Sequence, residues 1–292
     1  MKLAGSYVAL VSPFRDGKIN EEKIRELVKF HIENGTDGIV ACGTTGESPT
    51  LSDDEKNRII EIVIEEGKGK ITIIAGTGTN NTEKTIKATK YAKEMGADVA
   101  LVITPYYNKP TQEGLYRHFE EVIKSVDIPV MIYNVPGRTS VNILPETVTK
   151  LAKFDNIAAI KEASGNLNQV SEIINRCGDS IQVFSGDDSL FTPILSVGGV
   201  GVVSVIANFV PRDLKALYNA FIGNSLSQVQ KLHHKLLPLC TAMFFETNPI
   251  PVKTAMNLIG MEVGDLRLPL VPMSDANKQR LIDVLKNYGL MS

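Results

Sequence analysis

The chain has 292 residues, a length that one α/β barrel or two smaller domains can fill. It carries 31 lysine and arginine residues against 33 aspartate and glutamate residues, which excludes a strongly basic, nucleic-acid-binding surface. No apolar run reaches the roughly 18 residues that cross a bilayer. Arg15 and Asp16 interrupt the apolar start too early for a signal peptide, so the sequence predicts a cytoplasmic protein.

Eight short apolar segments of β type alternate with segments of helical period. The predicted strands, in chain order, are Tyr7–Val11, Gly38–Cys42, Ile71–Ala75, Val99–Ile103, Val130–Tyr133, Ile157–Ile160, Gln182–Ser185 and Gly201–Val205. Their nearly continuous apolar character is typical of parallel strands that are covered on both faces. The segments between them repeat apolar residues at helical spacing, as at Ile24, Leu27, Val28 and Ile32.

Eight strand-helix units match the count and length of an α/β fold of the (β/α)8 TIM barrel type, which we predict for residues 1–224. An open doubly wound sheet is the structural alternative. Its dinucleotide motif is incomplete, because Gly76 and Gly78 are followed by Asn81 at the position of the third glycine. The glycine-rich phosphate loop of nucleotide-binding proteins is also missing from the sequence.

After about Asn224 the pattern becomes helical only. The predicted helices are Leu226–Phe245, Pro251–Ile259 and Ser274–Tyr288. We therefore expect residues 225–292 to form a C-terminal helical extension of the barrel, with a surface available for contacts between subunits.

The cysteines and histidines show no spacing that is typical of a metal site. Cys42, Cys177 and Cys240 are far apart and odd in number, which argues against a disulfide framework. The four histidines form neither an HxH nor an HExxH motif. We expect the chemistry of this protein to proceed without a metal or another cofactor.

Active sites of barrels of this kind lie at the carboxyl ends of the strands. Lys161 follows the fully apolar segment Ile157–Ile160 and is therefore expected at such an end. Burial disfavours the charged form of an amine, and the neutral amine can attack a carbonyl to form a Schiff base. The alternative is a structural lysine that pairs with Glu162 or Asp187.

Tyr133 closes the neighbouring predicted strand, so its side chain is expected close to Lys161. A phenol beside an imine can transfer protons if other hydroxyl groups, such as those of Thr44 and Tyr107, hydrogen-bond to it. The alternative is a packing tyrosine at a strand end, with its hydroxyl group in water.

Two further positions can bind carboxylates. Thr44 and Thr45 lie between glycines in the sequence GTTGE, where hydroxyl and backbone N–H groups can hold a small carboxylate, although a capped turn explains the same letters. Arg138 is expected on a loop and can hold a second carboxylate, although a single loop arginine is usually solvated. Asp187 and Asp188 disfavour a phosphorylated substrate.

Five sequence blocks together resemble the dihydrodipicolinate synthases, within the pyruvate-dependent class I aldolases. The blocks are GTTGE at 43–47, TPYYNKP at 104–110, YNVPGRT at 133–139, IKEASGN at 160–166 and SGDD at 185–188. The resemblance covers essentially the whole chain, including Arg267–Leu270 near its end. It implies a lyase that condenses pyruvate with L-aspartate 4-semialdehyde to give 4-hydroxy-tetrahydrodipicolinate, in lysine and diaminopimelate biosynthesis.

The resemblance also implies roles for single residues. Lys161 forms the Schiff base with pyruvate, and Tyr133 transfers protons through Thr44 to Tyr107, which comes from a neighbouring subunit of a homotetramer. The implied substrate-binding residues are Thr45, Arg138, Gly186 and Val203: Thr45 holds the pyruvate carboxylate with help from the Val203 backbone, Gly186 lines the pocket, and Arg138 binds the carboxylate of the aldehyde.

Two other functions remain open. Another pyruvate-dependent aldolase, such as an N-acetylneuraminate lyase, shares the lysine and the tyrosine, but such lyases typically lack the arginine at 138 and have Ser-Thr at 44–45. A non-catalytic keto-acid-binding barrel would need neither an imine-forming lysine nor a proton relay.

The family's lysine-feedback site is matched only in part. Ser48, Asn80 and Tyr106 fit it, whereas Lys56 and Lys84 stand where lysine-inhibited members tend to carry histidine and glutamate. Because cationic residues repel a lysine effector, we expect weak or absent feedback inhibition.

Overall fold

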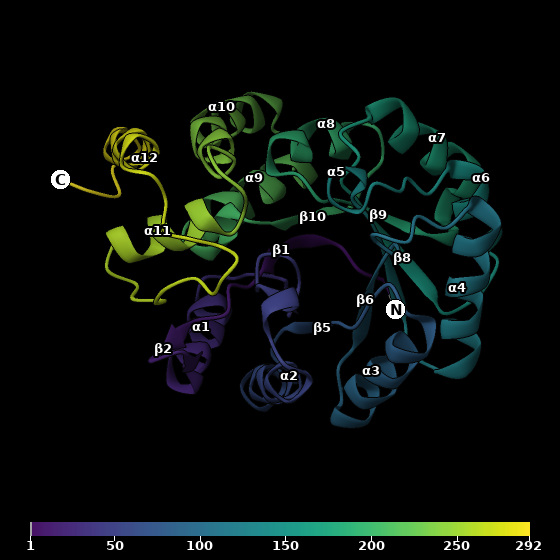
Figure 1. The fold of residues 1–292 in the computed structure, drawn as a ribbon. Coiled ribbons are helices and arrows are strands. Elements are labelled where there is room, and N and C mark those ends of the chain that lie inside the picture. Colours follow the sequence, from purple (N-terminus) through teal and green to yellow (C-terminus); the bar gives the residue numbers. More distant parts are fainter. Residues whose placement is uncertain (1) are drawn as a thin grey trace. The chain divides into compact units, whose positions relative to one another are not determined.

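The computed structural model describes residues 2–292 and contains a closed barrel of eight parallel strands (Figure 1). The strands follow the order β1-β10-β9-β8-β7-β6-β5-β4 around the barrel. Their bounds are β1 Gly5–Ala9, β4 Gly38–Ala41, β5 Thr72–Gly76, β6 Val99–Ile103, β7 Val130–Asn134, β8 Ile157–Glu162, β9 Gln182–Ser185 and β10 Gly201–Ser204. The predicted (β/α)8 fold is therefore confirmed, and each of the eight strands begins and ends within two residues of its predicted bounds.

The chain divides into two compact units, which are described separately. Among the described residues, the first comprises 2–5 and Ile73–Val203, and the second comprises Ser6–Thr72 and Ser204–Ser292. The predicted boundary at residue 224 between barrel and extension stays a prediction.

In the first unit, helices alternate with strands β5 to β10. These helices are α3 Thr82–Met95, α4 Gln112–Ser125, α5 Pro136–Thr139, α6 Pro145–Leu151, α7 Leu167–Cys177 and α8 Phe191–Ser196, with the 3-10 turns η2 Gly178–Ser180 and η3 Asp188–Leu190. Asn81, Thr111 and Asn166 each accept a hydrogen bond from the first turn of the helix that follows. Buried apolar residues of β6 to β9, α4, α6 and α7 form one continuous core.

The register between β7 and β8 fixes the relation of two predicted site residues. Tyr133 is paired with Lys161, and Asn134 with Glu162. Strand β8 extends two residues beyond the predicted end at Ile160, so Lys161 lies inside the strand. The strands therefore place the two side chains next to each other.

The second unit contains the remaining helices. They are α1 Glu21–Glu33, α2 Asp53–Gly67, α9 Pro211–Ile222, α10 Leu226–Ala242, α11 Ile250–Leu258 and α12 Asp275–Tyr288, with η1 Ser48–Thr50 and η4 Ile206–Asn208. The three helices predicted after residue 224 are confirmed, although α10 ends at Ala242 rather than at Phe245. Ser52 caps α2 through a complete capping box with Glu55.

A short antiparallel hairpin was not predicted from the sequence. Its strands, β2 Phe14–Arg15 and β3 Lys18–Ile19, have only two residues each, too few to show a period. In residues 2–292, no helix is both long and apolar enough to cross a membrane.

Candidate active site

Lys161 is a buried lysine with an aromatic neighbour. Its side chain is 6% exposed, and its Nζ lies 4.2 Å from the centroid of the Tyr133 ring, itself 5% exposed. The negative face of an aromatic ring attracts a lysine ammonium group at this distance. Among residues 2–292 Lys161 has no ion pair, so the structure gives no support to the alternative of pairing with Glu162 or Asp187.

The carboxylates considered as partners of Lys161 are bonded elsewhere. Glu162 points to the other face of β8, as alternate strand residues do. Its oxygens accept hydrogen bonds from Asn134 Nδ2 at 3.1 Å, from Gln169 Nε2 at 3.0 Å and from the backbone N of Ser164 at 2.7 Å. Asp187 accepts from the backbone N and the Oγ of Ser189, at 2.9 and 2.8 Å. This arrangement leaves the Lys161 amine available for chemistry.

Gly186 lies against the Lys161 side chain. A Cβ atom at this position would lie 3.1 Å from Lys161 Cε and 2.7 Å from Ala163 Cβ. The backbone N of Gly186 also donates to the carbonyl of Glu162 at 2.8 Å. Glycine therefore allows the chain just after β9 to lie close to the lysine, and Lys161, Tyr133 and Gly186 form one group. Val203 is buried in β10.

Two predicted residues of the same unit are exposed. Arg138 was expected on a loop, and that expectation is wrong: it lies in the four-residue helix α5, where Pro136 starts the turn and Ser140 N bonds to the Pro136 carbonyl. Tyr107 follows β6, and its side chain is 89% exposed. Its φ of 72° is left-handed, which is uncommon for a residue other than glycine.

The second unit carries the GTTGE sequence as a tight turn after β4. The backbone N of Glu47 donates to the carbonyl of Thr44 at 3.1 Å, and Glu47 has a left-handed φ of 53°. Thr45 is buried, and its Oγ1 accepts a hydrogen bond from Asn248 Nδ2 at 3.0 Å. A hydroxyl that accepts in this way can still donate its own proton, for example to a carboxylate.

A buried ion pair beneath this turn was missed by the sequence analysis. Lys253 Nζ donates to Glu47 Oε1 at 2.9 Å, and both side chains are at most 1% exposed. Burial lowers the pKa of Lys253, and the Glu47 carboxylate opposes that shift. The available signal was the position of Lys253 on the otherwise apolar face of α11, three residues after Ile250.

The described residues include no group of three or more His, Cys, Asp or Glu side chains arranged to hold a metal ion. Cys42, Cys177 and Cys240 are buried thiols. Burial raises the pKa of Cys42 to about 12, which makes it a poor nucleophile.

Comparison with known proteins shows similarity along nearly the whole chain. The model of the dihydrodipicolinate synthetase family matches residues 2–288. A 4-hydroxy-tetrahydrodipicolinate synthase of Syntrophobacter fumaroxidans is 55% identical over 288 residues, and one of Geotalea uraniireducens is 54% identical over 287, each covering 98% of this chain and 99% of the relative. The solved dihydrodipicolinate synthase of Aquifex aeolicus is 48% identical, with a TM-score of 0.97 over 99% of both chains.

Proposed function

The chain belongs to the dihydrodipicolinate synthetase family, and we propose that it condenses pyruvate with L-aspartate 4-semialdehyde to give 4-hydroxy-tetrahydrodipicolinate. The observation that carries this proposal is the buried Lys161 amine over the Tyr133 ring, without a carboxylate partner among the described residues. A lysine in this environment is suited to nucleophilic attack on a keto acid.

The reaction begins with attack of Lys161 Nζ on the carbonyl carbon of pyruvate. Loss of water gives the imine, and loss of a methyl proton gives an enamine. The enamine carbon forms a C–C bond to the aldehyde carbon of the second substrate. The amino group of that substrate then attacks the imine carbon, which closes the ring and releases Lys161.

The proton transfers of these steps are assigned to Tyr133. Its position beside Lys161 supports this role, because a general acid or base must lie within hydrogen-bonding reach of the reacting atoms. We assign Thr44 and Tyr107 to a hydroxyl relay with Tyr133. The exposure of Tyr107 in the single chain fits a residue that serves a neighbouring subunit.

Four residues are assigned to substrate binding. Thr45 donates its hydroxyl proton to the pyruvate carboxylate, supported by the orientation that Asn248 gives it, and the backbone of Val203 assists. Gly186 lines the pyruvate pocket next to Lys161. Arg138 binds the carboxylate of the aldehyde substrate with its planar guanidinium group.

The wider setting completes the proposal. We place the enzyme in the cytoplasm, in lysine and diaminopimelate biosynthesis, as a homotetramer without a cofactor. Residues 1–224 provide catalysis, and residues 225–292 form the helical extension.

The test of the proposed function is chemical trapping. The protein is incubated with pyruvate, reduced with borohydride, digested and examined by mass spectrometry. We expect a reduced pyruvate adduct on Lys161. Absence of an adduct would refute the Schiff-base mechanism and favour a non-catalytic keto-acid-binding barrel.

An acceptor screen separates the synthase from other pyruvate-dependent aldolases. Aspartate semialdehyde is expected to be consumed, whereas turnover of N-acetylmannosamine would identify an N-acetylneuraminate lyase. The Arg138→Ala variant should still be trapped with pyruvate but lose about a hundredfold in kcat/KM for the aldehyde, because a charge-assisted bidentate contact is removed. Equal loss of trapping and turnover would contradict the assignment of Arg138.

Regulation by lysine is proposed to be weak. Lys56 and Lys84 place cationic side chains where the effector would bring another positive charge. Initial rates are measured during a lysine titration, and strong inhibition at sub-millimolar lysine would contradict the proposal.

A further inference from the structure

Three residues of the C-terminal segment donate hydrogen bonds to two residues of the GTTGE turn, Thr45 and Glu47. Asn248 donates to Thr45 Oγ1, Lys253 donates to Glu47 Oε1, and the backbone N of Arg267 donates to Glu47 Oε2 at 3.1 Å. From the N-terminal side, Ser12 Oγ donates to the carbonyl of Gly46 at 2.6 Å. The turn is thus held by residues more than 200 positions away along the chain.

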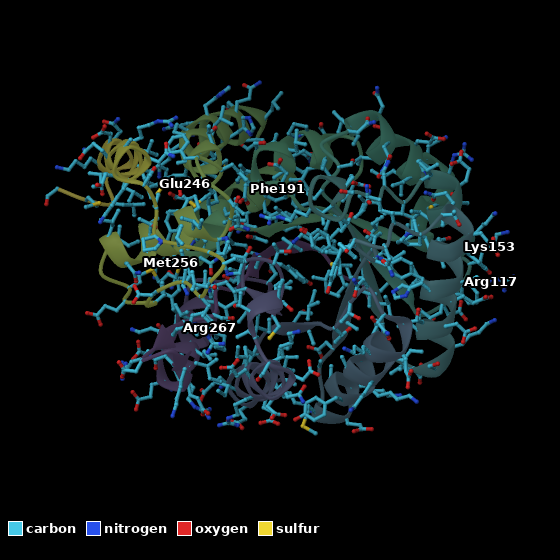
Figure 2. All side chains as sticks on the ribbon, viewed as in Figure 1. Arg117, Lys153, Phe191, Glu246, Met256 and Arg267 are labelled. Atoms are coloured by element: carbon cyan, nitrogen blue, oxygen red, sulfur yellow. The ribbon has the colours of Figure 1, made fainter. Side chains whose placement is uncertain are left out.

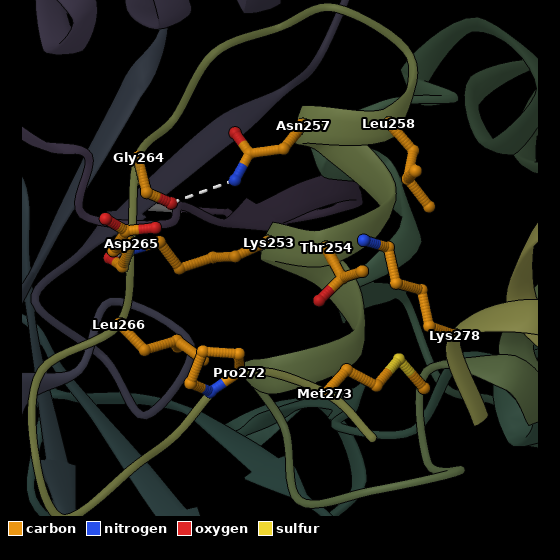
Figure 3. Close-up of a pocket in the computed structure, with 10 residues that line it drawn as sticks. All are labelled: Lys253, Thr254, Asn257, Leu258, Gly264, Asp265, Leu266, Pro272, Met273 and Lys278. Atoms are coloured by element: carbon orange, nitrogen blue, oxygen red, sulfur yellow. Dashed lines mark hydrogen bonds between the residues drawn. The ribbon is translucent and has the colours of Figure 1, made fainter. Parts of the chain in front are cut away.

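Lys253 is the centre of this arrangement. Figure 3 shows its side chain extending from α11 toward the segment that contains Asp265. Its Nζ donates to the carbonyls of Asp265 at 2.5 Å and Ser12 at 3.1 Å, as well as to Glu47. All three protons of the ammonium group therefore have acceptors, which is the condition for a buried ion pair to offset the cost of its desolvation.

The 264–267 segment is fixed in turn. Asn257 Nδ2 of α11 donates to the carbonyl of Gly264 at 2.9 Å (Figure 3). The guanidinium of Arg267, which is labelled in Figure 2, forms two hydrogen bonds to Glu55, at 2.7 and 2.6 Å. It also stacks 4.2 Å from the centroid of the Phe14 ring. The two donors to the Glu47 carboxylate, Lys253 Nζ and the backbone N of Arg267, are therefore both held in place by other contacts.

The geometry of the turn depends on Glu47. Its left-handed backbone follows directly after Thr44, Thr45 and Gly46, and such a backbone persists only when surrounding contacts impose it. If Glu47 relaxed, the chain would change direction at the two threonines. A shift of about 1 Å in a binding group is enough to reduce rate or affinity by up to about a hundredfold.

We propose that the buried Glu47–Lys253 ion pair is a positioning device, which holds Thr45 in the geometry that binds the pyruvate carboxylate. This proposal rests on the proposed function of Thr45. Glu47 and Lys253 are positioning residues that act through the turn. Under this proposal, the C-terminal helices contribute to substrate recognition through Lys253.

The test compares pyruvate dependence in matched variants. Lys253→Met removes the amine, and Glu47→Gln keeps the shape and one of the two acceptor oxygens but removes the charge. The control is Lys215→Met, which breaks an ion pair with Asp37 in the same unit, at distances of 2.6 and 2.7 Å. Asp37 lies immediately before β4, at the opposite end of that strand from the GTTGE turn. For each variant, thermal unfolding, borohydride trapping at varied pyruvate and steady-state KM and kcat are measured.

We expect Lys253→Met to raise both the pyruvate concentration for half-maximal trapping and the KM for pyruvate by about tenfold or more. The kcat at saturating pyruvate should stay within about threefold of wild type, because the lost interaction is one of binding. Glu47→Gln should show a smaller shift in the same direction. Lys215→Met should lower thermal stability while its half-saturating pyruvate concentration stays at the wild-type value.

If Lys253→Met folds and its half-saturating pyruvate concentration equals that of wild type, the positioning role is overturned. The proposed function stands in that case, provided that wild type forms the adduct. If Lys253→Met does not fold, Glu47→Gln decides: unchanged half-saturation overturns the proposal, and an increase supports it. Wild-type protein that forms no adduct with pyruvate would overturn the proposed function, and the positioning role with it.

Discussion

Two buried lysines in this protein have the same kind of aromatic neighbour and opposite surroundings. Lys161 Nζ lies 4.2 Å from the centroid of the Tyr133 ring, and Lys253 Nζ lies 4.3 Å from that of Phe14. Lys253 also donates to three oxygen atoms, including a buried carboxylate, whereas Lys161 has no ion pair among the described residues. Both lysines contact an aromatic ring, so the two sites differ in the oxygen acceptors around Lys253 Nζ.

The difference teaches how one side-chain type serves two purposes. An ammonium group with three fixed acceptors is held in place, because moving it would leave a buried carboxylate unpaired. An amine against a ring, without a fixed carboxylate, keeps its nitrogen free to form a bond with carbon. Lys253 is therefore suited to structure and Lys161 to catalysis.

The largest expected effect is that of Lys161→Met on activity. Removing the nucleophile should lower kcat by at least about 10⁴-fold and abolish borohydride trapping. The free energy of unfolding should be unchanged or slightly higher, because the variant replaces a buried amine that has no ion pair with an apolar side chain of similar length. Activity assays and urea unfolding of the same preparation check both parts. A large loss of stability would show that Lys161 also has a structural role.

Lys253→Met should give the reverse pattern, with stability as the main loss. Leaving the Glu47 carboxylate buried without its partner costs about 3–5 kcal/mol in the free energy of unfolding, measured by urea denaturation. The double variant Lys253→Met/Glu47→Gln should recover part of this loss, because no buried charge remains. If the single and double variants were equally unstable, the lost packing of Lys253 would account for the effect rather than the unpaired charge.

A smaller effect is expected from Gly186→Ala, which crowds Lys161 directly. The added Cβ would lie 2.7 Å from Ala163 Cβ and 3.1 Å from Lys161 Cε, so the lysine must move. We expect trapping to slow by about tenfold, with a loss of about 1–3 kcal/mol in stability. Gly137→Ala is the control, since a Cβ there has no neighbouring atom within 4 Å. Equal trapping rates in the two variants would mean that Lys161 tolerates displacement.

The region around Lys161 was predictable from the sequence for a physical reason. Parallel strands covered on both faces must be apolar throughout, so a lysine that follows such a segment is conspicuous. Neighbouring strands in a barrel then place Tyr133 beside it, as the register confirms. The short helix that carries Arg138 escaped prediction because four residues cannot show a helical period.

The region around Lys253 was not predictable in the same way. Its partner Glu47 is 206 residues away, and no local pattern connects the two. The glutamate belongs to a turn whose letters also fit a simple capped turn, and the lysine lies in helices that the sequence presents only as an extension. Ion pairs of this kind depend on tertiary packing, which buries both charged groups next to each other.

The smallest expected effect extends the contrast to acid pH. Hydrogen bonds from Arg267 hold the pKa of Glu55 at about 2, below its usual 4.5. Because the folded-state pKa is depressed, the stability that this carboxylate contributes is fully present above pH 4.5 and is lost as the pH falls toward 2. Glu55→Gln should therefore be less stable than wild type by about 1 kcal/mol at pH 7, and this difference should shrink between pH 4.5 and 2. Urea unfolding of both proteins at pH 7 and pH 3 measures it. A difference that stays constant across that range would mean that the charge of Glu55 contributes nothing to the contacts that hold Arg267, and through it Glu47, in place.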